Sequence, residues 1–242
     1  MALLSTEDVV VSFGGLRALS EANIDVDSGV VTGLIGPNGA GKTTLFNVIT
    51  GLQESSSGRV LFDGVDIAGR SPYKRARSGI ARTFQKLEAF DSLSARDNVL
   101  VAAEQRKAWE RSRFDPLAVA EELLDRVGIA EVADCMVGTL PTGTARLVEL
   151  ARALATMPRV LLLDEPSSGL NDEETQAMAR LLRGLVTEGL AVLLVEHDMS
   201  FVMGACELIY VLDFGRIIAT GPPADIRAHA AVRDAYLGTP VS

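Results

Sequence analysis

Residues 36–43 carry the residue types and the spacing of a loop that binds the phosphates of a nucleotide. They are Gly36, Pro37, Asn38, Gly39, Ala40, Gly41, Lys42 and Thr43, and Thr44 follows directly. This order fits the pattern G-x-x-x-x-G-K-[ST], in which glycines let the main chain curl with its N–H groups pointing toward the phosphates. We expect Lys42 to reach the β- and γ-phosphates and the Thr43 hydroxyl to hold Mg²⁺.

Two carboxylates at the end of an apolar run could complete such a site. Residues 160–163 are Val-Leu-Leu-Leu, and Asp164 and Glu165 follow them. Ligands of open α/β sheets bind beyond the carboxyl ends of strands. Asp164 suits water-mediated binding of Mg²⁺, and Glu165 could polarise a water that attacks the γ-phosphate. An acidic pair after a strand is a weak signal alone, and it gains specificity from Lys42 and Thr43.

The surrounding segments predict the elements that would position these residues. An apolar run at 30–35 precedes the glycine-rich loop, and a helix is expected over 42–50, where Gly51 stops it. A glycine-rich turn that binds nothing is the alternative, but the preceding strand lies where a phosphate loop needs it. Residues 94–155 are mostly helical in pattern, so we predict an α/β core interrupted by a helical subdomain. Further strands are predicted at 9–13, 22–26, 58–62, 160–163, 191–195 and 208–212, and a further helix at 173–187.

The composition is that of an α/β protein of one domain, or one domain plus a subdomain. The chain has 242 residues, 48% of them hydrophobic, and a formal net charge of −9. This acidic balance argues against nucleic acid as a ligand. No signal peptide and no apolar stretch of roughly 18 residues is visible, so we expect a cytoplasmic protein that meets a membrane only through a partner. Cys135 and Cys206 are expected to be two buried free thiols, with a disulfide as the alternative.

A charged stretch at 104–113 surrounds Trp109, the single tryptophan. We favour a solvated helix in which Trp109 packs locally. The alternative is a contact surface for another subunit.

Together these residues resemble the nucleotide-binding subunit of an ATP-binding cassette (ABC) transporter, over nearly the whole chain. Residues 36–43 match the Walker A loop, and 160–165 match the Walker B strand with its catalytic glutamate. The resemblance implies a P-loop NTPase fold with a RecA-like core, an antiparallel β subdomain and a helical subdomain. It implies one ABC domain over 1–242, with its core at 1–93 and 156–242 and its helical subdomain at about 94–155. The other matching residues are Phe13 before Gly14-Gly15, Gln85 after 81–84, residues 167–172, and His197 in Val-Glu-His-Asp.

The resemblance also implies a role for each matching residue. Phe13 would stack on adenine, Gln85 would touch Mg²⁺ and sense the transmembrane partner, and 167–172 would line a dimer seam. His197 would contact the γ-phosphate, and Glu165 and His197 would be the catalytic residues of ATP hydrolysis to ADP and phosphate. A lone histidine, phenylalanine or glutamine is usually structural, but their joint order around Walker A and B favours function.

The family's signature, usually Leu-Ser-Gly-Gly-Gln before a helix, aligns here with residues 140–144, Leu-Pro-Thr-Gly-Thr. Pro141 replaces the serine and has neither a side-chain donor nor an N–H group. Thr144 replaces the glutamine. A turn with a threonine helix cap would explain this segment, and Gly143 N–H could still face a phosphate.

In this family the ATP sites are shared across a head-to-tail dimer, so this signature would serve the partner's nucleotide. A homodimer would carry two weakened sites and a heterodimer would carry one. We therefore expect a second, different cassette subunit, with a homodimer as the alternative. Transmembrane permease subunits and, indirectly, a substrate-binding protein are the other implied partners, on the inner face of the cell membrane.

Three segments resemble the importers of branched-chain amino acids and of related amides or carboxylates. They are residues 13–19, a charged helical insert at about 103–116, and residues 232–238. The alternatives are a soluble ABC ATPase that remodels nucleic acid or ribosomes and a cassette that drives export. A P-loop kinase outside the family is disfavoured, since it would need neither His197 nor the region 140–154.

Overall fold

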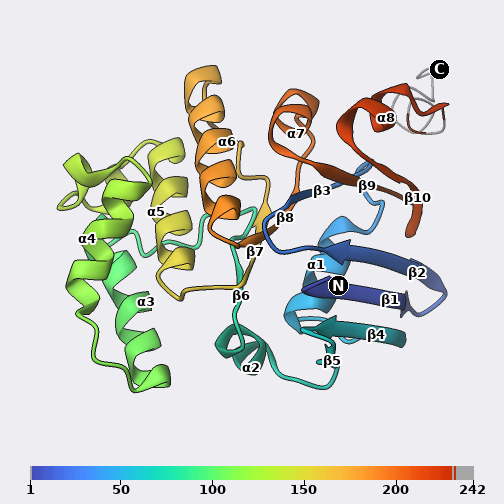
Figure 1. The fold of residues 1–242 in the computed structure, drawn as a ribbon, viewed down its shortest axis with the longest axis horizontal. Coiled ribbons are helices and arrows are strands. Elements are labelled where there is room, and N and C mark those ends of the chain that lie inside the picture. Colours follow the sequence, from blue (N-terminus) through green and yellow to red (C-terminus); the bar gives the residue numbers. More distant parts are fainter. Residues whose placement is uncertain (1, 231, 233–242) are drawn as a thin grey trace.

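Two β-sheets and a lobe of helices form the fold in the computed structural model, which describes residues 2–230 and 232 (Figure 1). The larger sheet has six strands in the order β10-β9-β3-β8-β7-β6. Adjacent strands from β9 to β6 run parallel, and β10 pairs antiparallel with β9. The strands are β3 (Val31–Ile35), β6 (Ile80–Arg82), β7 (Val160–Asp164), β8 (Ala191–Val195), β9 (Leu208–Asp213) and β10 (Arg216–Gly221).

Continuous apolar runs occupy the centre of this sheet, as the sequence predicts. Every residue of β3, β7 and β8 is buried, because helices cover both faces of the sheet. Helix α1 (Lys42–Thr50) follows β3 and ends at Gly51, whose φ of 79° suits glycine. Helix α6 (Asp172–Thr187) begins with a capping box between Asn171 and Glu174. The smaller helices of this part are α2 (Pro72–Arg77), α7 (Met199–Ala205) and α8 (Pro223–Ala228).

The second sheet is antiparallel, with the strand order β2-β1-β4-β5. It lies beside α1, on the side of the molecule opposite α3 and α4 (Figure 1). Thr6 is paired with Ile24 of β2 and with Val60 of β4, so β1 is one of the two inner strands. The predicted antiparallel β subdomain is therefore present. Its strands are β1 (Leu4–Phe13), β2 (Leu16–Val26), β4 (Ser57–Phe62) and β5 (Val65–Asp66).

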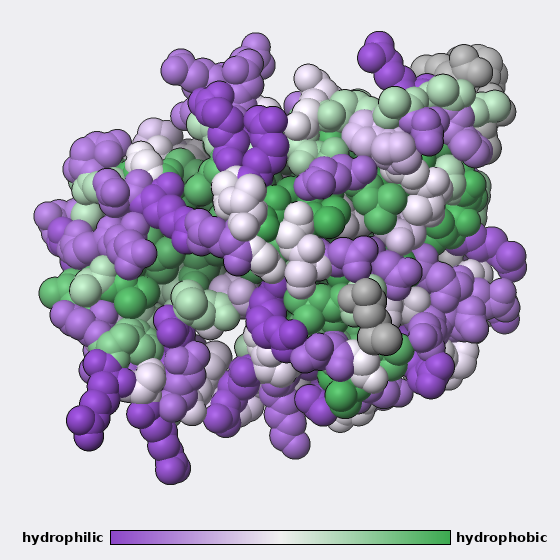
Figure 2. All heavy atoms as spheres, viewed as in Figure 1, coloured by the Kyte–Doolittle hydropathy of each residue, from purple (hydrophilic) through white to green (hydrophobic). Residues whose placement is uncertain are grey.

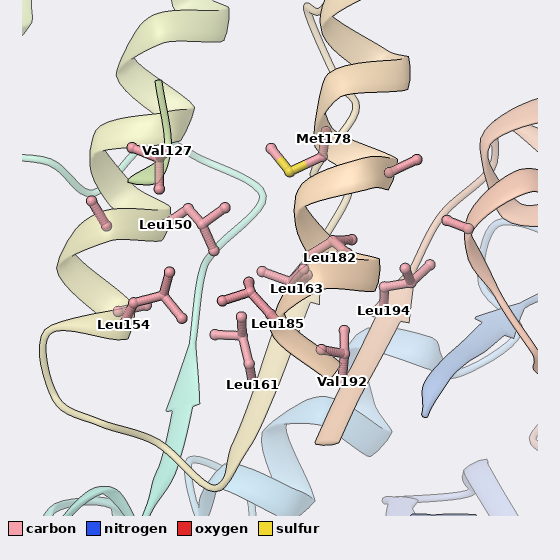
Figure 3. Close-up of a cluster of buried hydrophobic side chains, with 14 of the residues drawn as sticks. Val127, Leu150, Leu154, Leu161, Leu163, Met178, Leu182, Leu185, Val192 and Leu194 are labelled. Carbon is pink, nitrogen blue, oxygen red and sulfur yellow. The ribbon is translucent and has the colours of Figure 1, made fainter. Parts of the chain in front are cut away.

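The helical lobe stands on the far side of the larger sheet from β1 and β2 (Figure 1). It consists of α3 (Ala95–Glu110), α4 (Pro116–Arg126) and α5 (Thr142–Leu154), with 3₁₀ turns at 130–132 and 137–139. Apolar side chains of α5 and α6 meet those of β7 and β8 in one cluster (Figure 3). Leu150 and Leu182, for example, are fully or almost fully buried. This shared core fixes the lobe to the sheet at α5.

Three details differ from the sequence expectations. Cys206 is a buried free thiol, but Cys135 is a free thiol on the surface, because it lies in the turn between the two 3₁₀ segments. The predicted helical insert at about 103–116 is helical only up to Glu110, as the end of α3, and residues 111–115 form a linker to α4. Trp109 packs edge-on against Tyr73 of α2, with ring centroids 5.8 Å apart, rather than within its own helix. Residues 233–238 lie outside the described residues.

Candidate functional site

Four adjacent parallel strands bring the predicted site residues to one edge of the sheet. The glycine-rich loop follows β3, and Gln85 lies three residues beyond β6. Glu165 follows β7, and His197 lies two residues beyond β8. Because β3, β8, β7 and β6 are parallel neighbours, their carboxyl ends meet at the same edge. Residues as distant in the sequence as Gly36 and His197 thereby converge on one site.

The loop 36–43 has the backbone conformation that its glycines permit. Gly36, Gly39 and Gly41 have φ values of 155°, 82° and 111°. A Cβ atom on Gly36 would lie 2.0 Å from the Leu212 carbonyl oxygen, and one on Gly41 would lie 2.7 Å from the Ala18 carbonyl oxygen. Glycine is therefore required at both positions by contact as well as by conformation. Gly41 caps the N-terminus of α1, whose free N–H groups point into the loop.

The Lys42 side chain reaches back from the start of α1 into this loop. Its Nζ donates to the carbonyl oxygens of Gly36 at 2.6 Å and Pro37 at 2.9 Å. Burial lowers the pKa of Lys42, and the nearby carboxylates of Glu165 and Asp164 oppose that shift. The ammonium group thus lies within the field of both predicted carboxylates and holds the loop closed on itself. Among the other loop residues, Ala40 is buried, Pro37 and Thr44 are half-buried, and Asn38 and Thr43 are exposed.

Glu165 is at the meeting point of two other predicted residues. Its Oε1 accepts a hydrogen bond from Gln85 Nε2 at 3.0 Å and lies 3.8 Å from His197 Nδ1. The Glu165 backbone has a φ of 51°, in the left-handed region that non-glycine residues rarely adopt. Its N–H donates to Val195 O, which anchors this turn on β8. The glutamine, the glutamate and the histidine therefore form one contiguous group.

Asp164 forms a buried ion pair that the sequence did not reveal. Arg82 Nη2 lies 2.9 Å from Asp164 Oδ2, and both side chains are about 5% exposed. Arg82 Nη1 also donates to Asn47 Oδ1 at 2.6 Å, and its guanidinium lies over the rings of Phe46 and Phe84. Burial lowers the pKa of Arg82, and the bond to Asp164 opposes this. A residue on β6 thus fixes the carboxylate that is expected to bind Mg²⁺.

We expect replacement of Arg82 by methionine to lower the free energy of unfolding by about 3 kcal/mol, because Asp164 would be left buried without its counter-charge. Urea denaturation measures this loss. The matched control is Arg59→Met, which removes an exposed pair with Glu7 and should cost far less. Equal losses for the two variants would contradict the assigned importance of the buried pair.

Glu196 is a second residue that sequence reasoning missed. Its side chain is fully buried, and its Oε1 accepts from Ser167 N at 2.7 Å while its Oε2 accepts from His197 N at 3.1 Å. Glu196 therefore ties the turn after β7 to the turn after β8. An acidic residue next to His197 at the end of an apolar strand was the available signal.

The altered signature begins α5, but no threonine caps it. The helix starts at Thr142 and its N-cap is Pro141, so Thr142 and Thr144 both lie inside the first turn. The predicted threonine cap is therefore wrong. Within the described residues, no side chain bonds at this N-terminus. Gly143 is buried, and a Cβ there would lie 2.7 Å from Leu170 Cδ2.

Phe13 ends β1 and is half exposed. It pairs with Leu16 at the tip of the β1–β2 hairpin, next to the pairing of Ser12 with Arg17. Ala18, one residue further, touches the phosphate loop at Gly41. The hairpin therefore extends from the phosphate loop with Phe13 near its tip, where a nucleotide base could stack.

Comparisons with known proteins agree with this geometry. The family described as ABC transporter matches residues 19–168. The chain belongs to the ABC transporter ATP-binding family. A second family description, branched-chain amino acid ATP-binding cassette transporter, matches residues 216–242 of this ABC chain. The predicted cassette fold and ATP hydrolase class are thereby confirmed.

Individual ABC relatives match over nearly their whole length. The chain is 39% identical to the branched-chain amino acid transport ATP-binding protein BraF of Pseudomonas aeruginosa and 36% identical to LivG of Escherichia coli, over 98% of each chain. It is 33% identical to the lipopolysaccharide export ATP-binding protein LptB of Haemophilus influenzae, over 98% of both chains. A crystal structure of an ABC transporter cassette in its ADP conformation superposes with a TM-score of 0.88, at 31% identity, over 99% of this chain and 100% of that one.

Proposed function

We propose that this ABC cassette hydrolyses Mg·ATP and powers the uptake of branched-chain amino acids or a related small amide or carboxylate. The observation that carries this proposal is the convergence of Lys42, Glu165, Gln85 and His197 at one edge of the sheet. The similarity to BraF and LivG over the full chain supports the class of substrate. Uptake of labelled leucine by vesicles containing the assembled transporter, with and without internal ATP, tests it directly.

Two oxygen groups fit a magnesium ion beside the triphosphate. The Thr43 hydroxyl is exposed at the start of α1, and Asp164 is held by Arg82 at the end of β7. Hydroxyl and carboxylate oxygens are ligands that Mg²⁺ accepts together with phosphates and water. Gln85 would add an amide oxygen. When bound, the ion would neutralise developing charge on the phosphates, while Lys42 and the loop N–H groups hold them in place.

Glu165 would orient the attacking water, and His197 would steady the γ-phosphate. In this structure Gln85 Nε2 donates a hydrogen bond to Glu165 Oε1. A movement of the glutamine would therefore change how the Glu165 carboxylate is oriented toward water. A permease subunit that moves Gln85 could therefore control hydrolysis at Glu165.

An apolar groove beside Gln85 fits a helix of a permease subunit. It has a volume of about 710 Å³ and lies between the helical lobe and the core, where Figure 2 shows the surface hollowed. Leu52, Phe90 and Val101 line it and are each about half exposed. Phe84, next to Gln85, also lines the groove. A helix lying here would contact the segment that leads directly into Gln85.

Within the described chain, none of the helices is long and apolar enough to cross a bilayer. We propose a peripheral position on the inner face of the cell membrane, through permease subunits bound at this groove, because the relatives BraF and LivG are named as transport ATP-binding proteins. A second cassette subunit would complete the shared ATP sites, since the signature at 140–144 is altered.

Replacing Gln85 by alanine should leave Mg·ATP binding largely intact, because Lys42 and the loop N–H groups would still hold the phosphates, but abolish stimulation of hydrolysis by the transported solute. The reason is that Gln85 directly follows Phe84, which lines the groove, and its side-chain amide donates a hydrogen bond to Glu165. Nucleotide titration and ATPase assays of the reconstituted transporter check this. The matched control is Gln176→Ala, an exposed glutamine on α6 that does not line the groove and should leave stimulation unchanged. Normal transport by the Gln85 variant would remove the residue from this role.

Export is the second candidate, because LptB of Haemophilus influenzae matches the chain over the same length. The two functions differ in the direction of transport. ATP-dependent loss of leucine from loaded cells, rather than uptake, would favour the export function.

A further inference from the structure

Arg146 joins the signature helix to both loops that flank Glu165. Its side chain is about 9% exposed. Nη2 donates to Gln85 O at 2.7 Å, Nη1 to Phe84 O at 3.2 Å, and Nε to Ser168 O at 3.2 Å. One guanidinium therefore bonds main-chain oxygens after β6 and after β7. A planar group with donors in a fixed fork is suited to holding two loops in one geometry.

A second residue of the same helix holds the same segment. Glu149 Oε1 accepts from Glu88 N at 2.5 Å, and the Glu149 carboxylate lies 3.9 Å from Arg146 Nη1. The last main-chain bond of this segment to the sheet is Thr83 N to Leu162 O. Residues 84–88 are thus attached to α5 in the helical lobe, and the chain passes from sheet to lobe between Thr83 and Phe84.

The attachment leads directly to the reactive carboxylate. Arg146 fixes the main chain of Gln85, and the Gln85 amide holds Glu165 Oε1 at 3.0 Å. Gly143, three residues before Arg146 on α5, belongs to the signature segment. One helix therefore carries both the surface offered to a partner cassette and the arginine that positions this chain's own Gln85.

We propose that Arg146 is a positioning residue that transmits movement of α5 to Gln85 and Glu165, so that closure of the signature on the partner's nucleotide sets the state of this chain's own site. This inference rests on the proposed function, because it needs a second cassette and a working Gln85. The three hydrogen bonds to two different loops distinguish Arg146 from an arginine that only stabilises a helix.

A double-mutant cycle in the assembled transporter tests the inference. Arg146→Lys keeps the charge but loses the fork, and should lower solute-stimulated ATP turnover about tenfold with the KM for ATP within about twofold. In the Gln85→Ala background, the same substitution should change the ATP turnover that remains by less than about twofold. The reason is that the hydrogen bond from the Gln85 amide to Glu165, through which Arg146 acts, is already absent. The matched control is Arg106→Lys on α3, a mostly buried arginine paired with Glu110, which should change neither value.

Equal effects of Arg146→Lys in both backgrounds would overturn the inference and leave the proposed function standing. Wild-type turnover and transport by Gln85→Ala alone would overturn the inference together with the role assigned to Gln85, whereas a lack of ATP-dependent leucine uptake by the unaltered transporter would overturn the proposed function. Arg146→Gln, which keeps N–H donors without a buried charge, replaces the lysine variant if that variant does not fold. Amide hydrogen exchange of the unaltered transporter needs no variant: residues 84–88 and the first turns of α5 should change protection together when Mg·ATP binds. A change confined to 84–88 would also overturn the inference.

Discussion

Replacing Glu165 by glutamine should reduce ATP turnover by about 10²- to 10⁴-fold while Mg·ATP still binds. The substitution removes the only proton acceptor assigned to the attacking water, and general-base catalysis contributes a factor of this size. The amide oxygen can still accept from Gln85 Nε2, so the local geometry survives. Binding should also survive, because Lys42 and the loop N–H groups, which would contact the phosphates, are unchanged. Steady-state ATPase assays and nucleotide titration measure the two effects separately.

The same variant reveals the oligomeric state of the cassette. Because ATP is bound but not hydrolysed, a cassette that can pair with a second copy of itself should accumulate as a closed dimer, which light scattering with Mg·ATP would detect as twice the monomer mass. Glu122→Gln, an exposed substitution on α4, is the control and should keep wild-type turnover. A monomer that binds ATP would indicate an obligate heterodimer, as the altered signature suggests. Normal turnover by the isolated wild-type homodimer would contradict that heterodimer.

Replacing Lys42 by alanine should weaken Mg·ATP binding about 100-fold, which abolishes productive binding at ordinary nucleotide concentrations. Lys42 Nζ now bonds the carbonyl oxygens of Gly36 and Pro37, so it is already placed inside the loop that would hold the phosphates. Its loss removes the main cation of the site, and hydrogen bonds to charged groups are worth roughly 1.5–3 kcal/mol. Glu165 and Asp164 lie near Lys42 and would then repel the triphosphate with one fewer positive charge to offset them, although Arg82 would still pair with Asp164.

Titration with a fluorescent ATP analogue measures this loss. Lys86→Ala is the matched control, because Lys86 is an exposed lysine next to Gln85 that lies outside the loop 36–43. The Lys86→Ala variant should bind the ATP analogue with the affinity of the wild type. If the Lys42 and Glu165 variants both kept wild-type hydrolysis, the assignment of this site would be wrong.

Local pattern predicted much of the architecture. The strands at 160–164 and 191–195 and the helix at 42–50 follow from unbroken apolar runs and from Gly51, which act within a few residues. The short strands β6 and β10 were missed, since three to six half-buried residues carry little periodicity. The threonine cap failed for a similar reason: α5 begins one residue after Pro141, and sequence alone does not fix such a boundary.

The sequence by itself determined the kind of site, because the glycines and lysine of 36–43 work through their own backbone and spacing. Only the tertiary structure decided what controls it. Arg82 and Asp164 are 82 positions apart, and Arg146 reaches Phe84 and Gln85 from 61 or more positions away. A buried arginine finds its partners through the packing of strands and helices from distant segments, and no local pattern encodes which carbonyl or carboxylate will face it.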